Sequence, residues 1–203
     1  MNDVVFMASA IDEARKGLGR THPNPTVGAA IVKRGVVVGR GFHERAGAPH
    51  AEAVAISAAG KSVRGSTLYV TLEPCDHHGR TPPCTEAIIA AGIRRVVYAS
   101  ADPNPLVNGR GAQRLRRAGI EVQGGVLANE ADALNEPYLK AMREGLSFVT
   151  LKAAMTLDGK IANARGESKW ITSTVSRESV HRLRDRVDAL IVGVQTLIDD
   201  DPQ

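Results

Sequence analysis

Four residues of this sequence have the clearest chemical meaning: one histidine, one glutamate and two cysteines. His50 and Glu52 stand in the string PHAE, and the only two cysteines, Cys75 and Cys84, bound the string CDHHGRTPPC. One imidazole and two thiolates are typical zinc ligands, and three protein ligands leave a fourth tetrahedral position open. Because structural zinc sites are closed by four ligands, this set predicts a catalytic zinc that would hold water.

Glu52 is expected to move protons and not to bind the metal. Zinc lowers the pKa of a bound water toward about 7, so that water can attack an amine-bearing ring carbon at neutral pH. We expect Glu52 in the first turn of the helix that follows His50, close enough to take a proton and pass it to the leaving amine. A His-x-Glu string followed by a strand and a Pro-Cys pair is the order of the zinc deaminase signature.

Other interpretations of these residues stay open at this point. Two cysteines nine positions apart can be ordinary buried thiols, although a disulfide is disfavoured in a reducing compartment. A non-enzymatic zinc module would need a fourth ligand near the other three. A deaminase of transfer RNA adenosine would share the zinc core and could use a basic helix, with Arg110, Arg114, Arg116 and Arg117, although the chain has few aromatic residues to stack on a flipped base.

Composition limits the possible partners. The 203 residues are 43% hydrophobic, 24% charged and 3% aromatic, with a net charge of +4, which is typical of a globular α/β protein and is no nucleic-acid signature. No segment has transmembrane length, and the N-terminus lacks the basic and apolar regions of a signal peptide. We therefore expect a cytoplasmic homo-oligomer whose partner is a phosphorylated small molecule, and neither nucleic acid nor a membrane.

Strand and helix patterns alternate along the chain. Helices are predicted from Asp3, as the cap, to Leu18, and at 51–59, 84–91, 111–118 and 129–145, the last interrupted by Pro137. Strands are predicted at 27–32, 36–42, 67–72, 96–100 and 120–122, the first two forming a hairpin. This alternation predicts a partly parallel sheet with helices on both faces.

A second domain is expected to begin near Leu146, so that residues 1–146 and 147–203 form separate domains. Strands are predicted at 148–155 and 189–192, a turn at 157–160, and a helix from Ser173 or Thr174 to about Arg186. A segment of this size is near the lower limit for a stable isolated fold, so we expect an incomplete domain.

Four strings of the first domain together resemble the riboflavin-biosynthesis branch of the cytidine deaminase superfamily: THPNPTVGAAIV, GFHERAGAPHAE, TLEPCDHHGRTPPC and DPNPLVNGRG. The resemblance continues through FVTLKAAMTLDGKIA, SKWITS and VDALIVGVQTLIDDDP. The eight residues between Cys75 and Cys84, where most superfamily members have two, are typical of this branch. The resemblance implies a three-layer α/β/α sandwich with a mixed sheet, followed by the start of a dihydrofolate-reductase-like α/β domain.

The resemblance also implies a bifunctional deaminase and reductase. Its substrate would be 2,5-diamino-6-(5-phosphoribosylamino)pyrimidin-4(3H)-one, whose ring 2-amino group is hydrolysed to a carbonyl. By residue matching, Glu52 would be catalytic, His50, Cys75 and Cys84 would bind zinc, and the substrate contacts would be Asn24, His43, His77, Arg80, Asp102 and Asn104. The Asn24 amide can both donate to and accept from a pyrimidine edge, and the Arg80 guanidinium suits a phosphate.

The reductase half implied by the resemblance would reduce the ribosyl side chain with NADPH. The matching cofactor and substrate positions are Lys152, Ser168, Trp170, Thr172, Arg184 and Asp200. No glycine-rich loop that could hold a dinucleotide phosphate occurs before Gln203, so we expect an incomplete cofactor site and reductase activity only in the full-length protein.

Overall fold

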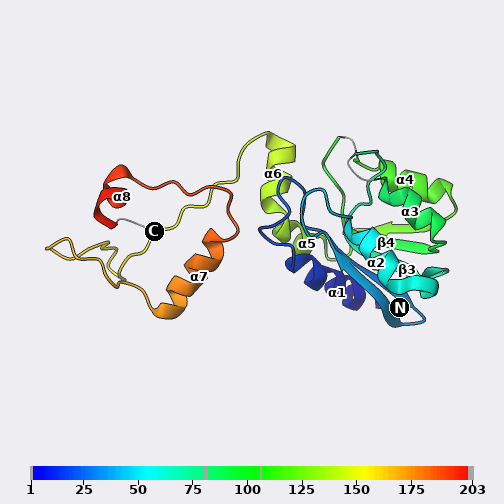
Figure 1. Cartoon of the computed structure of the whole chain (residues 1–203), viewed down its shortest axis with the longest axis horizontal. Coiled ribbons are helices and arrows are strands. Elements are labelled where there is room, and N and C mark those ends of the chain that lie inside the picture. The colour runs from blue at the N-terminus through cyan, green and yellow to red at the C-terminus, as the bar shows by residue number, and fades with distance from the viewer. Residues whose placement is uncertain (1, 80–81, 106, 201–203) are drawn as a thin grey trace. The chain divides into compact units, whose positions relative to one another are not determined.

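The computed structural model describes residues 2–79, 82–105 and 107–200 (Figure 1). The chain divides into two compact units, residues 1–148 and residues 149–203, and each is described by itself. The described residues contain no helix that is both long and apolar enough to cross a membrane.

A five-stranded mixed sheet forms the centre of the first unit. Its strands are β1 (Gly28–Lys33), β2 (Val36–Phe42), β3 (Thr67–Leu72), β4 (Arg95–Ser100) and β5 (Glu121–Gly124), in the spatial order β2-β1-β3-β4-β5. β1 is antiparallel to β2 and β3, whereas β3, β4 and β5 are parallel. The predicted hairpin is confirmed, and its turn places Arg34 and Gly35 at φ 51° and 80°, a left-handed turn that suits strand twist.

Helices cover both faces of this sheet. Because neighbouring strand residues point to opposite faces, Ala29 and Ile31 of β1 pack on one side, and Ala30 and Val32 pack on the other. The first side is covered by α2 (Ala51–Ala59), α3 (Cys84–Ala90) and α4 (Arg110–Arg117), and the second by α1 (Asp3–Arg15) and α5 (Ala128–Leu134). A short 3-10 helix, η1 (Gly60–Val63), follows α2, and α6 (Glu136–Glu144) ends the unit. The expected three-layer sandwich is confirmed.

Small residues bring α2 close to the sheet. A Cβ on Gly41 of β2 would lie 2.6 Å from the backbone oxygen of Ala51, so only glycine permits this approach. Ala51, Ala55 and Ala59 form the buried face of α2. The helix that follows His50 is therefore fixed tightly against β2.

Two helix predictions need correction. α1 ends at Arg15, and its buried face contains Met7, Ala10, Ile11 and Ala14, whereas Val4 is 52% exposed. Asn2, and not Asp3 as predicted, is the N-cap residue; Asp3 is the first residue of the helix, and its carboxylate accepts hydrogen bonds from Tyr69 and Arg95. The predicted helix at 129–145 breaks at Asn135 into α5 and α6, and Pro137 lies in the first turn of α6, where a missing N–H costs nothing.

The second unit has two helices, α7 (Thr174–Arg184) and α8 (Val194–Asp200), among its described residues. The predicted cap of α7 is confirmed, because the Ser173 hydroxyl accepts from the backbone N–H of Ser176. The predicted turn near Asp158 is also present, since the N–H of Gly159 donates to the Thr156 carbonyl at 2.9 Å.

The strands expected at 148–155 and 189–192 are wrong: within the described range 149–200 no residue is in a strand. A β-strand needs a hydrogen-bonded neighbour and a core that covers its apolar face. Leu151 and Ile191, from the two expected strands, are 93% and 96% exposed. Their apolar sequence alone therefore does not produce a sheet.

Candidate metal and substrate site

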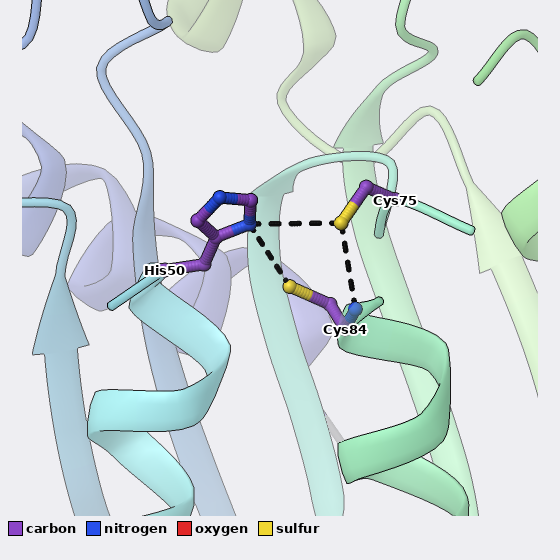
Figure 2. Close-up of side chains that lie close together, drawn as sticks. All are labelled: His50, Cys75 and Cys84. Atoms are coloured by element: carbon purple, nitrogen blue, oxygen red, sulfur yellow. Dashed lines mark hydrogen bonds between the residues drawn. The ribbon is translucent and has the colours of Figure 1, made fainter. Parts of the chain in front are cut away.

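Three residues far apart in the sequence meet at the helix starts beside β3. His50 is the N-cap of α2, Cys75 follows β3, and Cys84 is the first residue of α3 (Figure 2). His50 Nδ1 lies 3.1 Å from Cys84 Sγ and 3.6 Å from Cys75 Sγ, and all three ligand atoms lie within 4.8 Å of one another. The backbone N–H of Cys84 also donates to Cys75 Sγ at 3.4 Å. The sequence prediction that these side chains converge is confirmed.

The convergent set fits zinc in both chemistry and spacing. Zinc bonded at about 2.0–2.3 Å in tetrahedral geometry separates neighbouring ligand atoms by roughly 3.4–3.8 Å. The distances of 3.1 and 3.6 Å from His50 Nδ1 to the two sulfur atoms lie close to that range. Neither cysteine is in a disulfide. A zinc ion would therefore need only a small adjustment of these three side chains.

The electrostatics of Cys75 favour a bound cation, whereas the hydrogen bond to Cys75 and burial raise the pKa of the Cys84 thiol. A hydrogen bond from the Cys84 thiol, with a further contribution from His50, lowers the pKa of Cys75 well below that of an ordinary thiol. A separate hydrogen bond, between His50 and Cys75, raises the pKa of His50. Cys75 is thus prepared to act as a thiolate, and binding of a metal ion would require His50 and Cys84 to be deprotonated as well.

Glu52 lies in the first turn of α2, two residues after His50, and is only 3% exposed. Burial raises the pKa of its carboxyl above the usual range, and the negative charge of Cys75 raises it further. A raised pKa makes the carboxylate a stronger proton acceptor than an exposed glutamate. Its position on the ligand-bearing helix agrees with the expected first-turn placement.

The loop that carries Cys75 is held by the start of α4. The Glu73 carboxylate accepts from the backbone N–H groups of Gly109 and Ala112, each at 3.0 Å. A Cβ on Gly111 would lie 1.9 Å from the carbonyl oxygen of Pro74, so glycine is required where α4 crosses this loop. Glu73 stands directly before Pro74 and Cys75. Its carboxylate caps the start of α4 and is therefore not proposed as a metal ligand.

A second group of side chains joins the Cys75 loop to α3. Asp76 Oδ1 accepts from the Thr85 hydroxyl at 2.6 Å and from Arg114 Nη1 at 2.6 Å, and Arg114 Nη2 donates to Glu86 at 3.2 Å. Asp76 and Thr85 are the residues directly after the two cysteines. No local sequence pattern pairs Arg114 with Asp76, so the sequence indicates Arg114 only as part of a basic helix and not in this role.

Asn24 and His43 form a hydrogen-bonded pair beside the metal ligands. His43 is 3% exposed; its Nδ1 lies 3.1 Å from the Pro49 carbonyl, and its Nε2 lies 2.9 Å from Asn24 Nδ2. A carbonyl can only accept, so Nδ1 carries the proton, and burial keeps the ring neutral by lowering its pKa. Nε2 must then accept from the Asn24 amide, whose oxygen is not used in this bond.

Asp102 and Asn104 are adjacent in space, but Asp102 is only 6% exposed. Its Oδ1 accepts from the backbone N–H of Asn104 and from the Tyr138 hydroxyl, both at 2.9 Å. Burial raises the pKa of the Asp102 carboxyl. Asp102 thus stabilises the conformation of the loop in which it lies. Asn104 is half-buried.

The remaining deaminase positions lie in the segment between the cysteines. His77 is half-buried, and its Nδ1 is enclosed without a hydrogen-bond partner among the residues that the structure describes. Arg80 lies outside the described residues.

Those reductase positions whose side chains the structure describes do not form a comparable cluster. Lys152, Ser168 and Arg184 lie exposed on separate segments of the second unit, and the side chain of Asp200 lies outside the described part. Trp170 and Thr172 share a neighbour, Arg177. Its guanidinium stacks 4.4 Å from the Trp170 ring centre and donates to the Thr172 carbonyl at 2.6 Å.

Comparison with known families gives two matches along the chain. The cytidine and deoxycytidylate deaminase zinc-binding region matches residues 1–100, and the RibD C-terminal domain matches residues 147–203. The first match contains all three proposed zinc ligands and Glu52.

Individual relatives extend this similarity over nearly the whole chain. Riboflavin biosynthesis protein RibD of Aquifex aeolicus is 56% identical over 98% of this chain and 56% of its own length. A Thermotoga maritima diaminohydroxyphosphoribosylaminopyrimidine deaminase/5-amino-6-(5-phosphoribosylamino)uracil reductase has a TM-score of 0.94 and 50% identity, with 99% of this chain and 58% of that one covered. An Acinetobacter baumannii RibD structure has a TM-score of 0.93 and 51% identity, over 99% of this chain and 56% of that one. The chain spans about half the length of the curated relatives it matches.

Proposed function

We propose, because the chain belongs to the RibD family of riboflavin biosynthesis proteins, that its first unit is a zinc-dependent pyrimidine deaminase. The substrate proposed for it is 2,5-diamino-6-(5-phosphoribosylamino)pyrimidin-4(3H)-one. Water would replace the ring 2-amino group, which leaves as ammonia. The observation that carries this proposal is the meeting of His50, Cys75 and Cys84 beside the buried carboxyl of Glu52.

His50, Cys75 and Cys84 would hold the metal. When bound, zinc supplies a Lewis acid that makes water nucleophilic near neutral pH. Two thiolates and one neutral imidazole leave room for one further ligand in a tetrahedral site. The Asp76 and Arg114 contacts support this arrangement by holding the two cysteine-bearing segments together.

Glu52 would carry the proton between water and the leaving group. Its carboxylate takes one proton from the attacking water, and its carboxylic acid returns that proton to the ring amine, so the residue ends the cycle as it began. Burial raises the pKa of Glu52, which makes its carboxylate a stronger base for the first transfer than an exposed glutamate would be. Its place two residues after His50 keeps it beside the reacting carbon.

Asn24 would orient the pyrimidine ring. Because its Nδ2 donates to His43, its amide oxygen is presented as the acceptor for a ring N–H or an exocyclic amine. His43 is therefore proposed to act mainly by fixing the Asn24 amide, which differs from the direct substrate contact expected from the sequence. Asn104, His77 and Arg80 remain proposed contacts for the ribosyl phosphate.

We propose that the second unit belongs to the NADPH-dependent reductase half of the full-length protein. The RibD C-terminal domain match at residues 147–203 supports this assignment. Its described candidate contacts are mostly exposed and lie on separate segments, so they do not form a fitted cofactor site. No step of the reduction is derived from them.

A transfer RNA substrate is disfavoured by the use made of the basic helix. Arg114 is paired with Asp76 and Glu86, and Arg116 donates to the Val122 carbonyl at 3.3 Å. These contacts reduce the cationic surface available for phosphates. A phosphorylated small molecule therefore remains the proposed partner, and a homo-oligomer and a cytoplasmic location remain predictions for sedimentation and fractionation experiments.

Ammonia release from the phosphorylated diaminopyrimidinone tests the proposed function. The zinc-loaded chain should release one ammonia per substrate and give a product one mass unit heavier, as –NH2 becomes a carbonyl. Cytidine and an adenosine-containing tRNA stem-loop serve as competing substrates at matched concentration. Turnover of either of these, with none of the diaminopyrimidinone, would contradict the proposal.

A further inference from the structure

Asn135, at the junction of α5 and α6, makes a pair of contacts with a residue far away in the sequence, Thr26. Its Oδ1 accepts from the backbone N–H of Thr26 at 2.7 Å, and its Nδ2 donates to the Thr26 carbonyl at 2.9 Å. Both residues are buried, at 4% and 6% exposure, and they are 109 positions apart in the chain. One carboxamide thus satisfies both backbone groups of Thr26, as a neighbouring strand would.

Thr26 closes the base of the Asn24 loop, which we define as residues 21–26. The hydroxyl groups of Thr21 and Thr26 lie 3.2 Å apart, and the backbone N–H of Asn24 donates to the Thr21 carbonyl at 2.8 Å. Asn24 is therefore presented from a short turn whose C-terminal end is fixed by Asn135. A shift of Thr26 would displace the side-chain amide of Asn24, which also forms a hydrogen bond with His43.

Tyr138 makes a comparable contact with the Asp102 loop, residues 101–105. It follows Asn135 by three positions, so the two residues lie on neighbouring sides of the first turn of α6. Its hydroxyl donates to Asp102 Oδ1, the same atom that accepts from the N–H of Asn104. One turn of helix thus contacts two of the loops that carry proposed substrate residues.

We infer that the first turn of α6 is a positioning element for the deaminase site, holding the Asn24 loop through Asn135 and the Asp102 loop through Tyr138. The effect of α6 on catalysis rests on the proposed function. The holding of the two loops by Asn135 and Tyr138 does not depend on that function. Asn135 and Tyr138 touch no reacting group; they act through Asn24 and Asn104. Neither residue was identified from the sequence.

Asn135→Ala is the first test, with Asn129→Ala, at an exposed position of α5, as the matched control. Loss of the carboxamide should speed hydrogen exchange of the Thr26 amide at least about tenfold, because its buried acceptor is gone. It should lower kcat/KM for the diaminopyrimidinone by about 10- to 100-fold, mainly through KM, since misplacement of an orienting group is costly. Asn129→Ala should change neither quantity.

Combination with Asn24→Ala separates positioning from general destabilisation. If Asn135 acts through Asn24, adding Asn135→Ala to an Asn24→Ala protein should lower kcat/KM by less than about twofold further. An equal loss in both backgrounds would overturn the inference, as would unchanged Thr26 exchange in Asn135→Ala. A parent chain that releases no ammonia would refute the proposed function, while the exchange measurement would still decide the positioning of the loop.

Tyr138→Phe provides a gentler variant that removes one hydroxyl and keeps the ring. It should lower kcat/KM for the phosphorylated substrate by about 3- to 10-fold, a loss that corresponds to one hydrogen bond. The loss should be smaller for the same compound without its phosphate, because Asn104 is proposed to bind the ribosyl phosphate. Equal activity of Tyr138→Phe and the parent on the phosphorylated substrate would overturn the Asp102-loop half of the inference.

Discussion

The guanidinium of Arg114, on α4, donates to Asp76 at 2.6 Å, and Asp76 is the residue directly after Cys75. The same guanidinium reaches Glu86, in the first turn of the helix that begins at Cys84. Arg114 therefore connects the two segments that carry the cysteine ligands. A side chain of this kind affects a metal site by orienting its ligands and not by binding the metal.

Arg114→Met should weaken zinc binding while the fold is kept. We expect zinc to transfer to a chelator about tenfold faster, at the lower end of what outer contacts of metal ligands contribute. Arg117→Met, at an exposed position on the same helix, is the matched control. Equal transfer rates for both variants and the parent would show that the Arg114 contacts do not support the site.

Metal content should follow the three convergent ligands. The parent chain should bind about one zinc, and Cys75→Ala or Cys84→Ala should lose it, because two remaining ligands cannot hold zinc tightly. Elemental analysis after dialysis measures this directly, with ammonia release recorded on the same samples. Full turnover by a rigorously metal-free parent would contradict a zinc-dependent reaction.

Glu52→Gln should keep zinc and lose deamination. Glutamine is nearly isosteric with glutamate but cannot accept and return a proton, and such proton transfer contributes about 100- to 10,000-fold to rates. Zinc content, circular dichroism and ammonia release should be measured together. Glu44→Gln, at an exposed position near His43, should behave as the parent, and activity of Glu52→Gln within a few-fold of the parent would remove Glu52 from the proton-transfer role.

Local patterns in the sequence were sufficient for the elements that position the metal ligands. The helix at Ala51–Ala59 and the strand at Thr67–Leu72 have the predicted bounds, because apolar periodicity and a following glycine or turn mark their ends. His50, Cys75 and Cys84 could be grouped because zinc chemistry restricts which residue types can share a site. The individual substrate contacts stay predictions.

Side-chain contacts between residues far apart in the sequence could not be predicted from local patterns. No local pattern links Asn135 to Thr26 or Arg114 to Asp76, since each pair depends on how distant elements pack. The strand predicted at 148–155 failed for a related reason: a run of apolar residues favours a strand only where a neighbouring strand and a core are present.

Far from the metal ligands, Asp3 provides a prediction about stability and pH. Its carboxylate accepts two hydrogen bonds from Arg95, at 2.8 and 3.0 Å, and one from Tyr69 at 2.7 Å, joining α1 to β3 and β4. The Arg95 hydrogen bonds hold the pKa of Asp3 below its usual range. Asp3→Asn should therefore lower the free energy of unfolding at pH 7 by about 1–3 kcal/mol, since it weakens a charged, partly buried network.

The pH dependence of this effect has a definite sign. A carboxyl whose pKa is lower in the folded state stabilises the protein above its unfolded pKa of about 4, and the stabilisation is lost as the pH falls through the folded pKa. The difference between parent and Asp3→Asn, measured by urea unfolding, should thus be full at pH 7 and shrink below about pH 4. Asp12→Asn, which breaks an exposed pair with Arg15 on the same helix, should cost less than about 0.5 kcal/mol at either pH. A constant difference for Asp3→Asn between pH 7 and pH 3 would mean that the residue stabilises the fold by packing and not by its charge.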